Sequence, residues 1–183
     1  MSIHEMLETL EEEGHLIVYP APPGRPMRRR LYLAAGLYRE MGDRRSGLNF
    51  FGQMPAVQAV FKRWVCGDPV SMRLNDNGHQ ALLVRLKPPP EDIWELRVTE
   101  PKPQLRIFAC FAATDILVGV SAVNRDRLGR AFARSGRQSK LWTEAMYGCQ
   151  AEWRRLFGGA AAFRGRQARD YVSKDGFESG KPL

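Results

Sequence analysis

The chain has 183 residues, of which 44% are apolar and 26% charged, and its net charge is +8 with a pI near 9.8. This length suits one domain with a hydrophobic core, and the composition is that of an ordinary globular protein. No window approaches the roughly 18 apolar residues of a membrane-spanning helix, and the acidic N-terminus lacks the features of a secretion signal, so we expect a cytoplasmic protein without membrane contact.

The N-terminal region is predicted to contain two short helices and a strand. Residues 5–13 hold five glutamates and no base, and apolar residues recur there at helical spacing, which predicts an amphipathic helix. A strand over residues 16–19 and a proline-rich loop over residues 20–26 follow. The pattern over residues 31–41 is helical, with its apolar residues on one stripe.

The middle of the chain is predicted to be a helix followed by an antiparallel sheet. Pro55 suits the first position of a helix, and apolar residues recur after it at helical spacing until Gly67 ends the pattern. Short links join the strands that come next, which indicates antiparallel neighbours. The predicted strands cover residues 81–85, 93–98, 104–111 and 115–121. The expected fold class is therefore α+β, with an antiparallel sheet of three to five strands packed with helices.

The last third is predicted to be one long helix and a basic tail. An apolar stripe runs from Trp142 to Phe157, and residues 160–183 have few large apolar groups, which predicts an extended or mobile segment. Three isolated cysteines are expected to be buried thiols, and the histidines show no ligand spacing, so no metal site is predicted. We expect a single domain made of an N-terminal extension (1–53), a core (54–130), a C-terminal helix (131–159) and the basic tail (160–183).

The core carries a resemblance to a known family. Its predicted helix and sheet include the sequence Trp-Glu-Leu-Arg-Val at Trp94–Val98, and the next strand holds Arg106 before apolar residues. Over about residues 55–130 the chain resembles the RelE/HigB family, the small ribosome-associated toxins of toxin–antitoxin pairs. The resemblance implies a RelE-like core with helical extensions, cleavage of mRNA without metal or organic cofactor, and RNA, the ribosome and an acidic antitoxin protein as partners.

The resemblance also implies which residues act. Cleavage needs a base for the ribose 2′-hydroxyl, cations for the charge on the phosphate and an acid for the leaving oxygen. By position, Arg97 and Arg106 would be the cations, and Glu95 the only carboxylate placed to be the base. Arg125 and Arg127 follow the last core strand and would bind nucleic acid. An arginine cannot act as a base, and a carboxylate beside two arginines is a weak one, so whether the chain is an enzyme stays open.

Each of these residues has a structural alternative. The strand charges alternate with apolar residues, as in any half-solvated sheet with outward ion pairs. Arg28, Arg29 and Arg30 are read either as an arm on nucleic acid or as an exposed loop. The rival functions are a non-enzymatic nucleic-acid- or protein-binding factor of phage or mobile-element origin, and a protein module whose basic surface meets an acidic partner.

Overall fold

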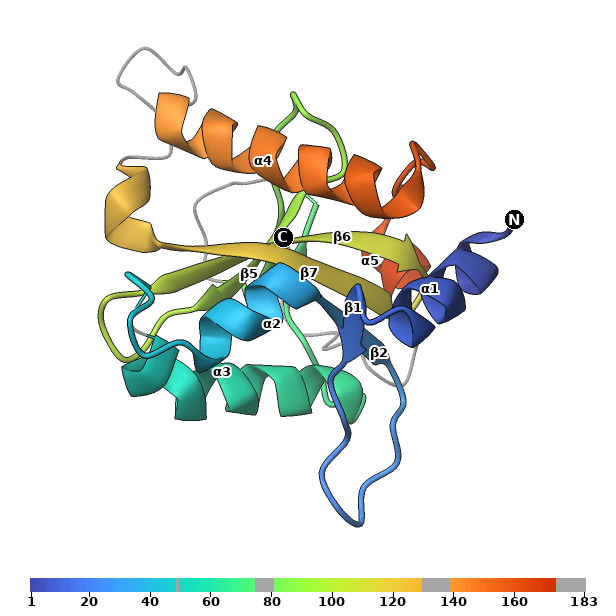
Figure 1. Cartoon of the computed structure of the whole chain (residues 1–183), viewed down its shortest axis with the longest axis horizontal. Coiled ribbons are helices and arrows are strands. Elements are labelled where there is room, and N and C mark those ends of the chain that lie inside the picture. Colours follow the sequence, from blue (N-terminus) through green and yellow to red (C-terminus); the bar gives the residue numbers. More distant parts are fainter. Residues whose placement is uncertain (49, 75–80, 130–138, 174–183) are drawn as a thin grey trace.

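The computed structural model describes residues 1–48, 50–74, 81–129 and 139–173, which form one sheet with helices on both sides (Figure 1). The helices are α1 (Ile3–Glu12), α2 (Ala35–Gly42), α3 (Phe50–Val65), α4 (Lys140–Phe157) and α5 (Ala168–Tyr171), with a 3₁₀ turn η1 (Arg125–Leu128). The strands are β1 (Leu16–Val18), β2 (Arg30–Ala34), β3 (Met72–Arg73), β4 (Leu83–Arg85), β5 (Trp94–Val98), β6 (Leu105–Ala113) and β7 (Ile116–Asn124).

The sheet is larger than the sequence predicts, and it is mixed. Its seven strands lie in the order β1-β2-β7-β6-β5-β4-β3. Strands β4 to β7 are antiparallel neighbours, as expected, but β2 runs parallel to β7 and β3 runs parallel to β4. The prediction of an antiparallel sheet of three to five strands was therefore wrong.

The main cause of this error is β2. Its residues lie between β1 and β7, and the four residues from Leu31 to Ala34 are all buried. The sequence of a strand that is covered on both faces is a continuous run of apolar residues. A short run of this kind also fits the spacing of apolar residues in a helix. The predicted helix over residues 31–41 is in fact a strand followed by α2, which begins only at Ala35. The predicted extension (1–53) thus supplies two strands of the sheet.

Alternation along the strands produces two apolar layers, one on each face. Helices α2 and α3 cover one face, and α1 and α4 cover the other (Figure 1). The stripe predicted for α4 is confirmed, because its large apolar residues are buried on the second face, and Gly158 ends the helix in a left-handed conformation. Helix α3 begins at Phe50, so Pro55 lies inside it and does not open it, contrary to the prediction.

The segment that follows α4 is packed against the sheet. We call residues 160–173 the C-terminal strap. The Phe163 N–H donates to the Phe111 carbonyl at 2.7 Å, and the Asp115 N–H donates to the Tyr171 carbonyl at 2.9 Å. The Tyr171 side chain is completely buried among aromatic rings. The first half of the predicted mobile tail is therefore structural, and its remainder lies outside the described residues.

Two further expectations concern membrane-spanning helices and the cysteines. Over the described residues, no helix combines the length and the apolar character needed to cross a membrane. The three cysteines, Cys66, Cys110 and Cys149, are buried free thiols, as predicted. A hydrogen bond with Cys110 and, to a smaller extent, desolvation raise the pKa of the Cys149 thiol well above its usual value. A raised pKa makes this thiol less reactive.

Candidate nucleic-acid interface

The three strand residues predicted for catalysis form a buried ion-pair cluster. Glu95 and Arg97 lie on β5 and Arg106 on β6, with Arg97 directly opposite Arg106. Arg97 Nε donates to Glu95 Oε1 at 2.5 Å, and Arg106 Nε lies 3.2 Å from Glu95 Oε2. The side-chain exposures are 0% for Glu95, 15% for Arg97 and 8% for Arg106. One carboxylate thus holds together two arginines that would otherwise repel each other across the strands.

This geometry removes Glu95 from the surface. Trp94 and Leu96 belong to the layer that faces α3, so Glu95 and Arg97 point to the opposite face of the sheet. A general base must come within about 3 Å of the hydroxyl that it deprotonates. Glu95 is inaccessible to an RNA ribose, and each of its two oxygens already faces a guanidinium. The cluster fits the expected cross-strand pairing of charges, but its members face inward and not outward.

Arg125 and Arg127 lie at the same end of the sheet as this cluster. Leu105 at the start of β6 pairs with Asn124 at the end of β7, and the Arg125 N–H donates to the Gln104 carbonyl at 2.7 Å. Turn η1 therefore begins beside the hairpin that joins β5 and β6. Arg106 pairs with Val123, so Arg125 follows β7 only two residues beyond the partner of Arg106.

Arg125 is held against the first turn of α4. Its guanidinium lies over the Trp142 ring, 5.4 Å from the ring centroid, and Nη1 donates to the Gly129 carbonyl. Trp142 itself is buried and packs edge-on against Phe108. Such a cation–π contact orients the arginine while it stays half-exposed.

The loop between α2 and α3 adds two more arginines to this end. The Asn124 side chain donates to the Gly47 carbonyl at 3.2 Å, and a Cβ on Gly47 would lie 3.0 Å from Arg127 Nη2. This contact places the loop that holds Arg44 and Arg45 next to η1. We call Arg44, Arg45, Arg125 and Arg127 together the basic end.

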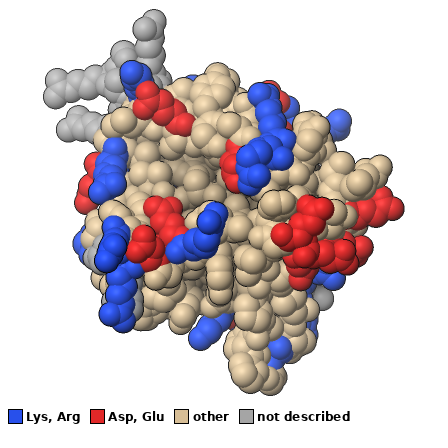
Figure 2. Space-filling model, viewed as in Figure 1, with Lys and Arg blue, Asp and Glu red and all other residues tan. Residues whose placement is uncertain are grey.

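The basic end lies far from the acidic helix. Figure 2 shows the carboxylates of α1 gathered on the right, while Lys and Arg side chains line the left edge, near η1, with a few carboxylates between them. Arg45 and Arg127 are exposed, and within the described part of the chain neither has a carboxylate within ion-pair distance. These two guanidinium groups are therefore available to an anionic partner.

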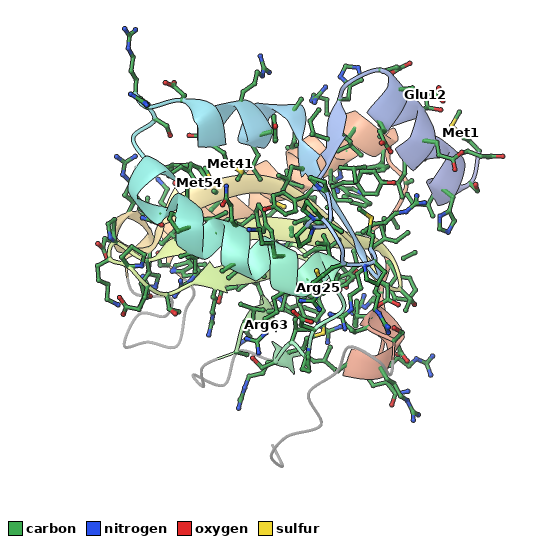
Figure 3. All side chains as sticks on the ribbon, turned by 90° about the horizontal axis from the view of Figure 1, so that it is seen from below. Met1, Glu12, Arg25, Met41, Met54 and Arg63 are labelled. Atoms are coloured by element: carbon green, nitrogen blue, oxygen red, sulfur yellow. The ribbon has the colours of Figure 1, made fainter. Side chains whose placement is uncertain are left out.

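The third predicted group, Arg28 to Arg30, lies at the opposite end of the sheet. Arg30 pairs with Ile116 at the start of β7, whereas Arg125 follows its end. The nine residues of β7 separate the two groups by roughly 25–30 Å. Figure 3 labels Arg25 and Arg63 in this second region, close to the end of α3. The two groups cannot contact the same phosphate.

Within the group Arg28 to Arg30, Arg29 has a structural role. Its side chain is 1% exposed, Nη1 donates to the Asp68 carbonyl at 3.1 Å, and Nε lies 3.4 Å from the Asp115 carboxylate. The guanidinium also lies over the Trp64 ring, 5.1 Å from its centroid. Burial lowers the pKa of Arg29, and the charge of Asp115 opposes that effect. Arg29 joins the end of α3 to the turn between β6 and β7, while Arg28 and Arg30 are exposed.

We expect the replacement Arg29→Met to lower the free energy of unfolding by about 2–4 kcal/mol, because carbonyl groups of the α3 terminus lose a charged donor. Urea denaturation measures this loss. The matched control is Arg28→Met, which changes an exposed side chain and should cost less than about 0.5 kcal/mol. Equal losses in the two variants would contradict the structural role of Arg29.

Sequence reasoning identified Arg125 and Arg127 of the basic end, but it did not place Arg44 and Arg45 beside them. Their charge suits phosphate, yet a loop of 43–47 has no periodicity that places it in space. Only the contact of Gly47 with Asn124 and Arg127 brings it to the sheet. The one available signal was composition, namely paired arginines in a glycine-containing loop.

No metal centre competes with this interpretation in the described ranges, where no group of three or more His, Cys, Asp or Glu side chains is placed to hold an ion. Comparisons with protein-family models, with curated proteins and with solved structures find no match for this chain.

Proposed function

We propose that the protein binds RNA in the cytoplasm through its basic end, and that it does not cleave that RNA with the strand residues. The observation that carries the proposal is the convergence of Arg45, Arg125 and Arg127 at one end of the sheet. Among described residues, none of the three is paired with a carboxylate. Guanidinium groups bind phosphate oxygens in a bidentate manner, and several of them in one place attract a polyanion.

The sequence contains three further arginines shortly after η1. Arg130, Arg134 and Arg137 follow η1 within a few residues, and this stretch contains no carboxylate after Asp126. Their positions lie outside the described residues. RNA is favoured over other polyanions because the resemblance to ribosome-associated toxins covers the same elements. The order of α3 and the antiparallel strands β4 to β7 is compatible with that resemblance.

The buried state of Glu95 argues against cleavage by the predicted catalytic residues. Arg97 and Arg106 neutralise this carboxylate, and all three side chains are largely inaccessible. The cluster therefore lacks both an exposed base and cations that could meet a phosphate. An acidic antitoxin-like protein would be attracted to the same basic end, and this partner stays a prediction.

Binding is tested with a labelled single-stranded RNA by fluorescence anisotropy over a series of salt concentrations. The variant Arg45→Gln, Arg127→Gln should bind more weakly, and the slope of log K against log salt should fall by about 1.4, because each phosphate contact contributes about 0.7 for a single strand. The control Lys62→Gln, Lys87→Gln removes two exposed charges near the other end of the sheet. Identical slopes in the two variants would contradict the assignment of RNA binding to the basic end.

Cleavage is tested separately by brief induction in a bacterial host and primer extension on an abundant mRNA. We expect intact mRNA. Discrete new 5′ ends that require translating ribosomes would instead support the toxin-type prediction, and they would contradict the non-cleaving part of this proposal.

A further inference from the structure

A second candidate site lies under the C-terminal half of α4, away from the basic end. A pocket of about 260 Å³ opens between this helix, the turn before β5 and the start of the C-terminal strap. Its volume lies just below the range of about 300–1,000 Å³ that is usual for ligand sites, so it suits a small ligand. Trp142, which contacts Arg125 of the basic end, and Trp153, which lines the pocket, are about 16 Å apart along the axis of α4. The pocket is thus distinct from the proposed RNA site.

One wall of the pocket holds an incompletely satisfied carboxylate. The Asp92 side chain is 14% exposed, and its closest cation is Arg164, whose Nε lies 3.8 Å from Oδ1. In the part of the chain that the structure describes, no group donates a hydrogen bond to this carboxylate. Burial raises the pKa of Asp92, and the charge of Arg164 opposes that rise. A partly buried carboxylate of this kind gains from a cationic donor that enters the pocket.

The other walls offer an anion-binding group and an apolar surface. Arg154 on α4 is exposed beside the pocket, and no carboxylate among the described residues lies within ion-pair distance of it. Trp153 is fixed by a hydrogen bond from Nε1 to the Ala160 carbonyl at 2.7 Å. Ile93 and the alanines of residues 160–162 complete an apolar lining. The pocket also holds Glu91, whose carboxylate is paired with Arg164. It therefore presents the Asp92 carboxylate, the Arg154 guanidinium and an apolar floor within a small volume.

We propose that this pocket binds a free α-amino acid with an apolar side chain. The ammonium group would meet Asp92, the carboxylate would meet the fork of Arg154, and the side chain would pack on Trp153 and the alanines. Each polar end of such a ligand finds the opposite charge, and the amide of Gln150 offers a further hydrogen bond. This inference does not depend on RNA binding.

Isothermal titration calorimetry with three matched ligands tests the proposal. The ligands are L-leucine, leucinamide, which lacks the carboxylate, and 4-methylpentanoate, which lacks the ammonium group. We expect saturable binding of L-leucine and at least about tenfold weaker binding of each analogue, as is usual for the loss of one charged hydrogen-bonding group. Absence of saturable leucine binding up to about 10 mM, or equal binding of all three ligands, would overturn the proposal.

Variants assign the two charges. Asp92→Asn keeps the backbone, because asparagine tolerates the φ of 60° observed at this position. It should weaken leucine and leucinamide about tenfold or more and leave 4-methylpentanoate unchanged, whereas Arg154→Gln should weaken leucine and 4-methylpentanoate and leave leucinamide unchanged. The control Arg155→Gln lies outside the pocket, paired with Glu152, and should change none of the affinities. Arg45→Gln, Arg127→Gln should retain leucine binding, which separates this proposal from the RNA proposal.

Discussion

Replacing Glu95 by glutamine is expected to lower the free energy of unfolding by about 3–5 kcal/mol, because the buried Arg106 and the partly buried Arg97 lose the anion that they share. Arg97 and Arg106 face each other across β5 and β6, so their repulsion becomes uncompensated in the variant. Urea denaturation followed by circular dichroism measures the loss. A variant as stable as the wild type would show that the cluster is solvated and open to a ligand.

The control for Glu95 replaces the whole cluster by apolar residues. Glu95→Leu, Arg97→Leu, Arg106→Leu removes all three charges together, and its stability should lie within about 1–2 kcal/mol of the wild type or above it. Recovery in this variant would show that the loss in Glu95→Gln arises from unpaired charge and not from altered packing. In that case, loss of RNA binding or cleavage in an Arg97→Ala, Arg106→Ala variant would reflect impaired folding.

Tyr171→Ala is expected to cost about 3–5 kcal/mol, the usual range for truncation of a buried aromatic side chain. The ring lies 4.7 Å from Trp94 and 4.8 Å from Phe111, measured between centroids. Removing it leaves a cavity between the C-terminal strap and the sheet. Calorimetric or urea unfolding measures the effect, and a loss below about 1 kcal/mol would mean that the strap is not part of the cooperative structure.

The hydroxyl of Tyr171 provides the matched comparison. It donates to the Gly165 carbonyl at 3.0 Å and accepts from Arg85 Nη1 at 3.3 Å. Tyr171→Phe keeps the ring and removes only these hydrogen bonds, so it should cost about 0.5–1.5 kcal/mol. Similar losses for Phe and Ala would contradict the importance of ring packing.

The sequence predicted those elements whose pattern is long and one-sided. The stripe of α4 and the alternation around Glu95 are decided by local periodicity, which the fold preserves. Strand β2 could not be predicted in this way, because it is covered on both faces and Leu31–Ala34 carries no alternation. The C-terminal strap was also missed, because a few well-placed residues such as Tyr171 anchor it and its average composition is polar.

The candidate sites were predictable only in part, for a similar reason. Arg125 and Arg127 follow a recognisable strand, so their place at the sheet end could be expected. The burial of Glu95 and Arg29 depends on which face of the sheet the helices cover, and single-sequence patterns contain no such information. The pocket at Asp92 is formed by three segments that meet only in the folded chain.

The parallel pairing of β2 with β7 has a consequence for biosynthesis. Arg30 lies opposite Ile116, so synthesis must advance 86 residues beyond Arg30 before the partner strand of β2 begins. At typical elongation rates of about 5–20 residues per second, β2 waits roughly 4–17 s with the edge that pairs with β7 uncovered on the nascent polypeptide. During that interval only the short β1 can cover one edge of it, so chaperone binding to the emerging N-terminal third should be strongest before β7 appears.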